Sequence, residues 1–167
     1  MKKKILILLL LCFLLVGCGK RVESGTDVSS KSDTDGTSGN LICSRVGNIS
    51  GNASTVLSYD IKYRNGYITT LHSIEKVQST DSAILDQYEA AYRKIFKAYE
   101  DLKYYTNTVT RTNTEVSSDT LIEYNRVNMD ELKRIENSEQ SIIRNGKVSL
   151  KDWLELAEKL GTRCTEK

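Results

Sequence analysis

Apolar and polar side chains alternate between Thr55 and Val77, and this alternation predicts a β-hairpin. Asn65-Gly66 lies between the two halves, and this dipeptide accepts the positive φ angles of a two-residue type I′ turn. The turn predicts strands over about Thr55–Arg64 and Tyr67–Val77, in which directly opposed residues share a sheet face. The expected opposed pairs are Tyr63/Ile68, Ile61/Thr70, Tyr59/His72 and Leu57/Ile74.

The segment after the hairpin has the apolar spacing of an amphipathic helix. A helix from about Ala83 to Asp101 would place its apolar side chains on one stripe, which is expected to pack on the sheet. Asp81 or Ser82 can cap its first turn. An earlier strand near Ile42–Val46 is expected to join the edge of the hairpin.

The C-terminal third predicts two more strands and two more helices. The strands are expected over about Lys103–Arg111 and Glu115–Tyr124, and a short helix over Asn128–Ile135. A last helix is capped by Ser149 and ends at Gly161. Together these elements predict an α+β domain with a single antiparallel sheet, helices packed on one face and the order ββ(β)-α-ββ-α-α.

Residues 1–17 have the pattern of a bacterial lipoprotein signal peptide. Lys2-Lys3-Lys4 precedes the apolar run Ile5–Val16, whose helical length of about 18 Å is short of a hydrocarbon core of roughly 30 Å. The residues Leu15-Val16-Gly17-Cys18 match the lipobox, which predicts cleavage between Gly17 and Cys18 and lipidation of the Cys18 thiol. The alternative is an ordinary secretory signal followed by a chance cysteine.

Residues 18–40 are expected to form a lipidated cysteine and a disordered tether, because Gly, Ser, Thr and Asp leave almost nothing to bury. Residues 41–167 are long enough for one domain. Acyl chains on Cys18 would hold that domain on the extracytoplasmic face of the cell membrane. In a cell with two membranes, Gly19 lacks the acidic retention signal of the inner membrane, so the outer membrane is expected.

Charge argues against a nucleic-acid partner. Removal of the signal peptide leaves 21 basic and 22 acidic residues, although the full chain has a net charge of +2. A nearly neutral chain lacks the electrostatic footprint that nucleic-acid binding requires.

Two cysteines, Cys43 and Cys164, remain after Cys12 leaves with the signal and Cys18 is lipidated. Outside the reducing cytosol they are expected to form a disulfide. The alternative is two free or metal-binding thiols, but a single histidine and the lack of another cysteine pair disfavour a zinc site.

His72 is the only histidine, and Asp60 or Glu75 would be natural partners for acid–base chemistry. The expected register places His72 on the apolar face and Asp60 on the other, which favours a half-buried structural role. The chain contains no Gly-x-Ser-x-Gly elbow and no HExxH, Walker A or GxGxxG motif. The sequence therefore predicts no catalytic residue, no cofactor and no metal site.

Tyrosine is the most suggestive residue type, because its ring and hydroxyl together suit contact surfaces. Most of the nine tyrosines fall at core spacing, whereas Tyr67, Tyr104 and Tyr105 are less easily placed inside. These three are predicted to form a contact patch. The alternative is that they are edge-strand tyrosines without a binding role.

The order of elements resembles the YehR-like group of small bacterial lipoproteins. The segments that carry the likeness are YDIKYRNGYITTLHS (Tyr59–Ser73) and DTLIEYNRVNMDELK (Asp119–Lys133), within a region covering about 41–160. The resemblance implies the same fold and an envelope lipoprotein, and it carries over no functional residues.

The function expected from these observations is a non-enzymatic interaction module that is anchored in the membrane and binds an envelope protein or a cell-wall component. One alternative is a lipoprotein that binds a small ligand or solute. Another is an envelope hydrolase that uses His72.

Overall fold

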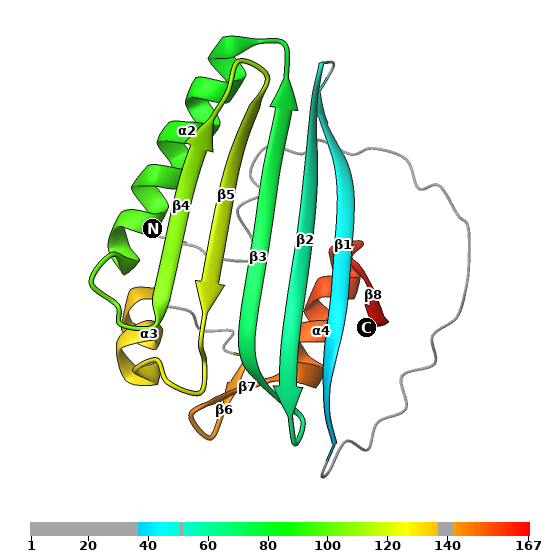
Figure 1. The fold of residues 1–167 in the computed structure, drawn as a ribbon, viewed down its shortest axis with the longest axis vertical. Coiled ribbons are helices and arrows are strands. Elements are labelled where there is room, and N and C mark those ends of the chain that lie inside the picture. The colour runs from blue at the N-terminus through cyan, green and yellow to red at the C-terminus, as the bar shows by residue number, and fades with distance from the viewer. Residues whose placement is uncertain (1–36, 51, 137–141) are drawn as a thin grey trace, which may run out of the picture.

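The described part of the chain folds into one open antiparallel sheet of eight strands with three α-helices on one face (Figure 1). The computed structural model describes residues 37–50, 52–136 and 142–167. The architecture confirms the predicted α+β class, the single sheet and the helices on one face. The observed order is βββ-α-ββ-α-ββ-α-β, so the sheet contains three short strands that the sequence pattern did not predict.

The first three strands form an antiparallel meander in the middle of the sheet. They are β1 (Ser38–Ser50), β2 (Ala53–Arg64) and β3 (Tyr67–Ser79). Asn65 and Gly66 adopt φ angles of 52° and 75°, which confirms the predicted hairpin turn. Because β1 begins at Ser38, the last residues of the predicted tether, 38–40, belong to the sheet.

The pairing of β2 with β3 contains a β-bulge close to this turn. Tyr63 pairs with Ile68, but the next pair is Lys62 with Thr70, so Thr69 is an extra residue in β3. Its hydroxyl donates a hydrogen bond of 3.1 Å to the Lys62 carbonyl. A single inserted residue reverses the faces of all the residues that follow in the strand.

The bulge corrects the predicted register. His72 pairs with Asp60 rather than with Tyr59, and both side chains lie on the face away from the helices. The predicted pair Tyr63/Ile68 is confirmed, whereas Ile61/Thr70, Tyr59/His72 and Leu57/Ile74 are wrong by one residue. The observed partners are Ile61/Leu71, Tyr59/Ser73 and Leu57/Glu75.

A long helix and a second hairpin extend the sheet on one side. Helix α2 (Ser82–Phe96) is capped by Asp81, whose carboxylate accepts the Ala83 N–H at 2.9 Å, and it continues into the 3-10 turn η2 (Lys97–Tyr99). Strands β4 (Tyr105–Arg111) and β5 (Glu115–Ile122) pair with each other, and β5 also pairs with β3. Helix α2 packs on these strands through one hydrophobic cluster, which contains Leu85, Tyr88, Tyr92, Val77 and Val116.

The C-terminal elements are divided between this side of the sheet, where the next helix packs near Tyr99 and Tyr105, and the opposite side, where the last helix and the last strand lie. Helix α3 (Met129–Glu136) begins after Asn128, whose side chain accepts the Asp130 and Glu131 N–H groups, as predicted. A small hairpin of β6 (Ile143–Arg144) and β7 (Lys147–Ser149) follows. Helix α4 (Leu150–Lys159) is capped by Ser149, and β8 (Arg163–Glu166) follows Gly161, which has a φ of 81°.

The main strands are ordered β4-β5-β3-β2-β1-β8, and β7 pairs with the start of β3. Cys43 of β1 lies directly opposite Cys164 of β8, and the two form a disulfide. This confirms the predicted pair and excludes the alternative of free or metal-binding thiols. In the chain-entropy model, closing a loop that spans 121 residues stabilises the fold by about 4–5 kcal/mol.

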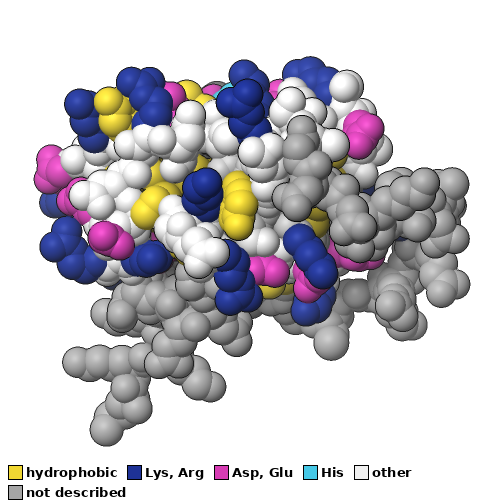
Figure 2. Space-filling view, turned by 90° about the horizontal axis from the view of Figure 1, so that it is seen from below, with side chains coloured by type: hydrophobic (Ala, Val, Ile, Leu, Met, Phe, Trp, Pro, Cys, Tyr) yellow, Lys and Arg dark blue, Asp and Glu magenta, His cyan; other side chains and the backbone are white. Residues whose placement is uncertain are grey.

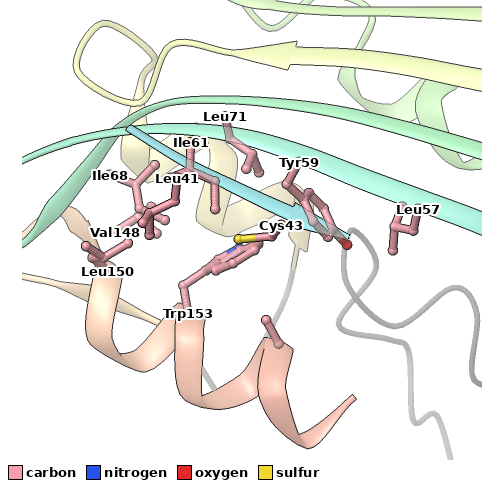
Figure 3. Packing of buried hydrophobic residues seen from close by; sticks show 11 residues of the cluster. Leu41, Cys43, Leu57, Tyr59, Ile61, Ile68, Leu71, Val148, Leu150 and Trp153 are labelled. Atoms are coloured by element: carbon pink, nitrogen blue, oxygen red, sulfur yellow. The ribbon is translucent and has the colours of Figure 1, made fainter. Parts of the chain in front are cut away.

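The core beneath the disulfide is centred on Trp153, which is fully buried (Figure 3). The Trp153 and Tyr59 rings meet edge to face, with centroids 5.1 Å apart. Around them lie side chains from β1, β2, β3, β7 and α4, namely Leu41, Cys43, Leu57, Ile61, Ile68, Leu71, Val148, Leu150 and Ala157. This cluster attaches α4 and the disulfide to the same part of the sheet.

The predicted signal peptide, its cleavage position Gly17/Cys18 and residues 19–36 of the tether lie outside the described residues. Within the described part of the chain, none of the helices has the length and apolar character needed to cross a bilayer.

Candidate functional site on the uncovered sheet face

The helices of the described residues cover only one face of the sheet, and alternate side chains of every long strand therefore point away from them. We call this second side the uncovered face. Short hydroxyl residues are frequent on it, interspersed with aliphatic and charged ones. Its members include Ile42, Ser44 and Val46 of β1; Ser54, Val56, Ser58 and Asp60 of β2; His72, Ile74 and Lys76 of β3; Ser117, Asp119 and Leu121 of β5; and Thr106, Thr108 and Thr110 of β4.

Four aliphatic side chains form a continuous diagonal across this face. Val46 of β1 lies directly opposite Val56 of β2. Ile74 of β3 is the diagonal neighbour of Val56, and Leu121 of β5 is the diagonal neighbour of Ile74. Val46 is 73% exposed and Leu121 is 37% exposed, and these two are the exposed large hydrophobic residues of the described chain. We call these four residues the aliphatic diagonal.

Ion pairs flank the aliphatic diagonal. His72 Nε2 lies 2.8 Å from Asp119 Oδ1, and Lys167 Nζ lies 2.9 Å from Asp60 Oδ2. The Lys167 ammonium lowers the pKa of the Asp60 carboxyl through a hydrogen bond and its charge, against a smaller opposing effect of burial. These pairs are exposed, so they contribute little stability, but they leave the centre of the face close to neutral.

The observed position of His72 differs from the predicted one. His72 is half-buried and hydrogen-bonded to a neighbour, Asp119, as predicted, but it lies on the uncovered face and not on the apolar face that the sequence predicted. The structure therefore places an aspartate beside His72, as the hydrolase hypothesis requires. Its other requirement is a nucleophile, and among the described residues no serine or threonine hydroxyl is hydrogen-bonded to His72.

The predicted tyrosine patch is only partly compatible with the structure. Tyr105 is 7% exposed and stacks on Tyr99 with ring centroids 4.8 Å apart, so its assignment to an exposed patch was wrong. Its place in β4 directs its side chain under α2 and η2. Tyr67 and Tyr104 are half-buried and lie at the lower end of the sheet, where the patch remains a prediction.

Cations lie over both of these half-buried rings. Arg126 lies 4.0 Å and Lys103 5.0 Å from the Tyr104 ring centroid, and Lys147 lies 5.2 Å from that of Tyr67. Hydrogen bonding by Arg126, followed by that of Lys103, lowers the pKa of the Tyr104 hydroxyl. Figure 2 views this end of the molecule and shows Lys and Arg side chains around a few hydrophobic ones.

A half-buried acid, Glu136, lies at the end of α3. Burial raises the pKa of the Glu136 carboxyl to about 7, and its charge contributes to the raised pKa values of Tyr99, Tyr105 and Tyr124. Burial is the larger cause for each tyrosine. Sequence spacing gave no signal of this cluster, because its members come from four separate segments.

Metal chemistry has no visible basis in the described residues, among which no three His, Cys, Asp or Glu side chains form a group able to hold an ion. The uncovered face has the chemistry of a binding surface, because it combines a small aliphatic area with hydroxyl groups and paired charges.

Sequence comparison matches the chain to one family. A family model described as a domain of unknown function (DUF8824) matches residues 62–167. None of the curated proteins matches the chain in sequence.

Two solved structures resemble the fold. The NMR structure of the Escherichia coli YehR protein has a TM-score of 0.53 and 12% identity, covering 78% of this chain and 93% of that one. At this identity the likeness shows a YehR-like fold and nothing more. The NMR structure of a protein from Streptococcus pneumoniae TIGR4 has a TM-score of 0.47 and 14% identity, covering 90% of this chain and 100% of that one.

Proposed function

The chain belongs to the DUF8824 family, whose description assigns no activity, and we propose that it is a lipid-anchored envelope protein whose uncovered face binds a protein partner. The observation that carries this proposal is the aliphatic diagonal. Its four side chains remain in contact with solvent although the same strands bury their opposite face under helices.

The membrane anchor is supported by the N-terminal sequence. Three lysines, an apolar run and Leu15-Val16-Gly17-Cys18 occur in the order that lipoprotein export requires. The Cys43–Cys164 disulfide suits a protein that leaves the reducing cytosol. The bilayer is then a partner through the acyl chains on Cys18, on the extracytoplasmic face of the cell membrane or, in a cell with two membranes, of the outer membrane.

A protein partner fits the uncovered face better than a cell-wall glycan. The aliphatic diagonal is rimmed by hydroxyl groups and ion pairs, which is the usual arrangement of an apolar interface core inside a polar rim. Sugar rings are commonly bound by stacking on aromatic side chains. Among the described residues, none of those that flank the aliphatic diagonal is Trp, Tyr or Phe.

Membership of the YehR-like lipoprotein group is part of the same proposal. It is supported by the segments Tyr59–Ser73 and Asp119–Lys133 and by the shared fold. The proposal assigns no enzymatic activity to the chain.

Photo-crosslinking in intact cells tests the interface. A photoreactive residue is placed at Val46 or Leu121 of the full chain, and at the exposed Lys94 of α2 as the matched control. A discrete protein adduct from Val46 and Leu121, and none from Lys94, is expected. Equal labelling from Lys94, or no adduct from either position on the aliphatic diagonal, would overturn the protein-binding proposal.

Metabolic labelling tests the anchor separately. Cells are supplied with an alkyne fatty acid, and the protein is expected to carry the label. The substitution Cys18→Ala should abolish it, whereas Cys12→Ala, which removes the other cysteine of the N-terminal segment, should not. Label that persists in Cys18→Ala would contradict lipidation at this residue.

A further inference from the structure

Two Arg-Asn-Gly turns lie side by side at the lower end of the sheet. Arg64-Asn65-Gly66 joins β2 to β3, and Arg144-Asn145-Gly146 joins β6 to β7. Asn145 and Gly146 have φ angles of 52° and 73°, nearly those of Asn65 and Gly66. The two hairpins are joined by the pairing of β3 with β7, and the Leu150 N–H donates to the Gly66 carbonyl at 3.0 Å. We call residues 62–68 and 142–152 the twin-turn end.

The twin-turn end is strongly basic, although the chain as a whole is nearly neutral. It has five basic residues, and its one acid, Asp152, is bound to Arg144 at 2.7 Å. The other four cations form no ion pair with any described residue. They are Lys62, Arg64, Lys147 and Lys151. A concentration of uncompensated positive charge at one end of a domain attracts an anionic surface.

The chain also enters the domain at this end. Ser38 pairs with Arg64, and the Asn65 N–H donates to the Thr37 carbonyl at 2.8 Å. The sequence places 19 residues between Cys18 and Ser38, which reach at most about 65 Å when fully extended. A lipid on Cys18 would therefore attach the domain to the bilayer through the twin-turn end, and the opposite end lies about 40 Å away along the 13 residues of β1. Because the tether can span more than this length, it brings the twin-turn end within reach of the bilayer but does not by itself orient the domain.

We propose that the twin-turn end docks on the anionic phospholipid headgroups of the membrane that holds the lipid anchor. This inference rests on the lipid anchor of the proposed function. Each Lys or Arg held close to an anionic leaflet adds to the electrostatic attraction between the domain and the membrane. Tyr67, with Lys147 over its ring, adds an aromatic side chain with a polar tip, a type that is enriched at the headgroup level.

Docking in this way would set the orientation of the whole domain. The strands run from the twin-turn end to the opposite end, so they would stand on the membrane and present the uncovered face sideways (Figure 1). The aliphatic diagonal would then be open to a partner that is anchored in the same membrane or diffuses beside it. Without docking, a tethered domain would present that face in every direction.

The test uses the lipidated full-length protein in vesicles of phosphatidylcholine, with or without one third phosphatidylglycerol. A fluorescent residue at the exposed Ser38, which pairs with Arg64 at the twin-turn end, donates energy to acceptors on the bilayer surface. Docking is expected to hold Ser38 against the bilayer, so transfer should be about twofold higher on the anionic vesicles. High salt should abolish the difference.

Charge-reversed variants decide whether the twin-turn end is responsible. Arg64→Glu/Lys147→Glu should restore the transfer seen on phosphatidylcholine, whereas the control Lys94→Glu/Lys159→Glu makes the same charge change on α2 and α4 and should not. Equal transfer on both vesicles, or restoration by the control pair, would overturn docking. Vesicle flotation reads the anchor independently: protein that does not float with pure phosphatidylcholine contradicts lipidation, and protein that floats without a change in transfer contradicts docking alone.

Discussion

The two faces of β2 and β3 differ in what their side chains do. On the covered face, Tyr59 and Ile61 are almost fully buried against helix α4 and the disulfide. On the uncovered face, the alternating residues are short, hydroxylated or charged, with Val56 and Ile74 as the aliphatic exceptions. The proposed function thus places binding on the opposite side of the strands from the core that stabilises them, so single substitutions can test the two roles separately.

The largest loss of stability is expected from the covered face. Trp153→Ala removes the centre of the cluster around Tyr59 and should lower the free energy of unfolding by about 3–5 kcal/mol. Urea unfolding followed by far-UV circular dichroism measures it. A loss below about 1 kcal/mol would show that α4 is not packed on the sheet as described.

Removal of the disulfide on the covered face is expected to give the second-largest loss of stability. Cys43→Ser/Cys164→Ser frees a loop that spans 121 residues and should cost about 2–5 kcal/mol. Cys43 is also fully buried, so the serine hydroxyl adds a desolvation cost at that position. Reduction of the wild-type protein should shift the urea midpoint in the same direction, whereas the double variant should not respond to reductant.

The difference between the faces also explains what the sequence could predict. Several sequence signals act through local backbone geometry, and the structure confirms the turn and the helix ends that they predicted. These signals are Asn65-Gly66, Asp81, Asn128, Ser149 and Gly161. Fold class followed from these local signals together with periodicity. None of them requires knowledge of a distant segment.

The features that were missed depend on pairing between segments. Thr69 is an unremarkable residue in an alternating strand, and only its partners in β2 show that it is a bulge. That one residue moved His72 to the uncovered face and assembled the aliphatic diagonal. Strand β8 is four residues long and is fixed by Cys43–Cys164 and by its pairing with β1, so no periodicity identifies it.

The third expected effect is a pH dependence of stability that arises from Glu136, the half-buried acid at the end of α3. Glu136 has a pKa raised to about 7 by burial, compared with an ordinary value of 4.5. The folded state therefore binds more protons than the unfolded state between these pH values, and stability should fall by about 2–3 kcal/mol as the pH rises from 4.5 to above 7.

Glu136→Gln separates this effect from other titrations. The variant carries no charge at this position, so it should lose that fall in stability and exceed the wild type above pH 7. Thermal unfolding at pH 5 and pH 8 gives the comparison. Parallel pH profiles for the two proteins would mean that Glu136 is not buried in the folded state.

The smallest effect on stability is expected on the uncovered face, where the effect on binding should be greatest. Val46→Ser/Leu121→Ser removes the two most exposed members of the aliphatic diagonal, and since neither fills a core position, the free energy of unfolding should change by about 0.5 kcal/mol or less. The same variant should lose the crosslinked adduct formed from a probe at Ile74, which lies between them. Loss of the adduct in a fully stable protein would separate recognition from folding, because the altered residues contribute nothing else. If the variant instead unfolds readily, the uncovered face is part of the stabilising core and its proposed role in binding loses its basis.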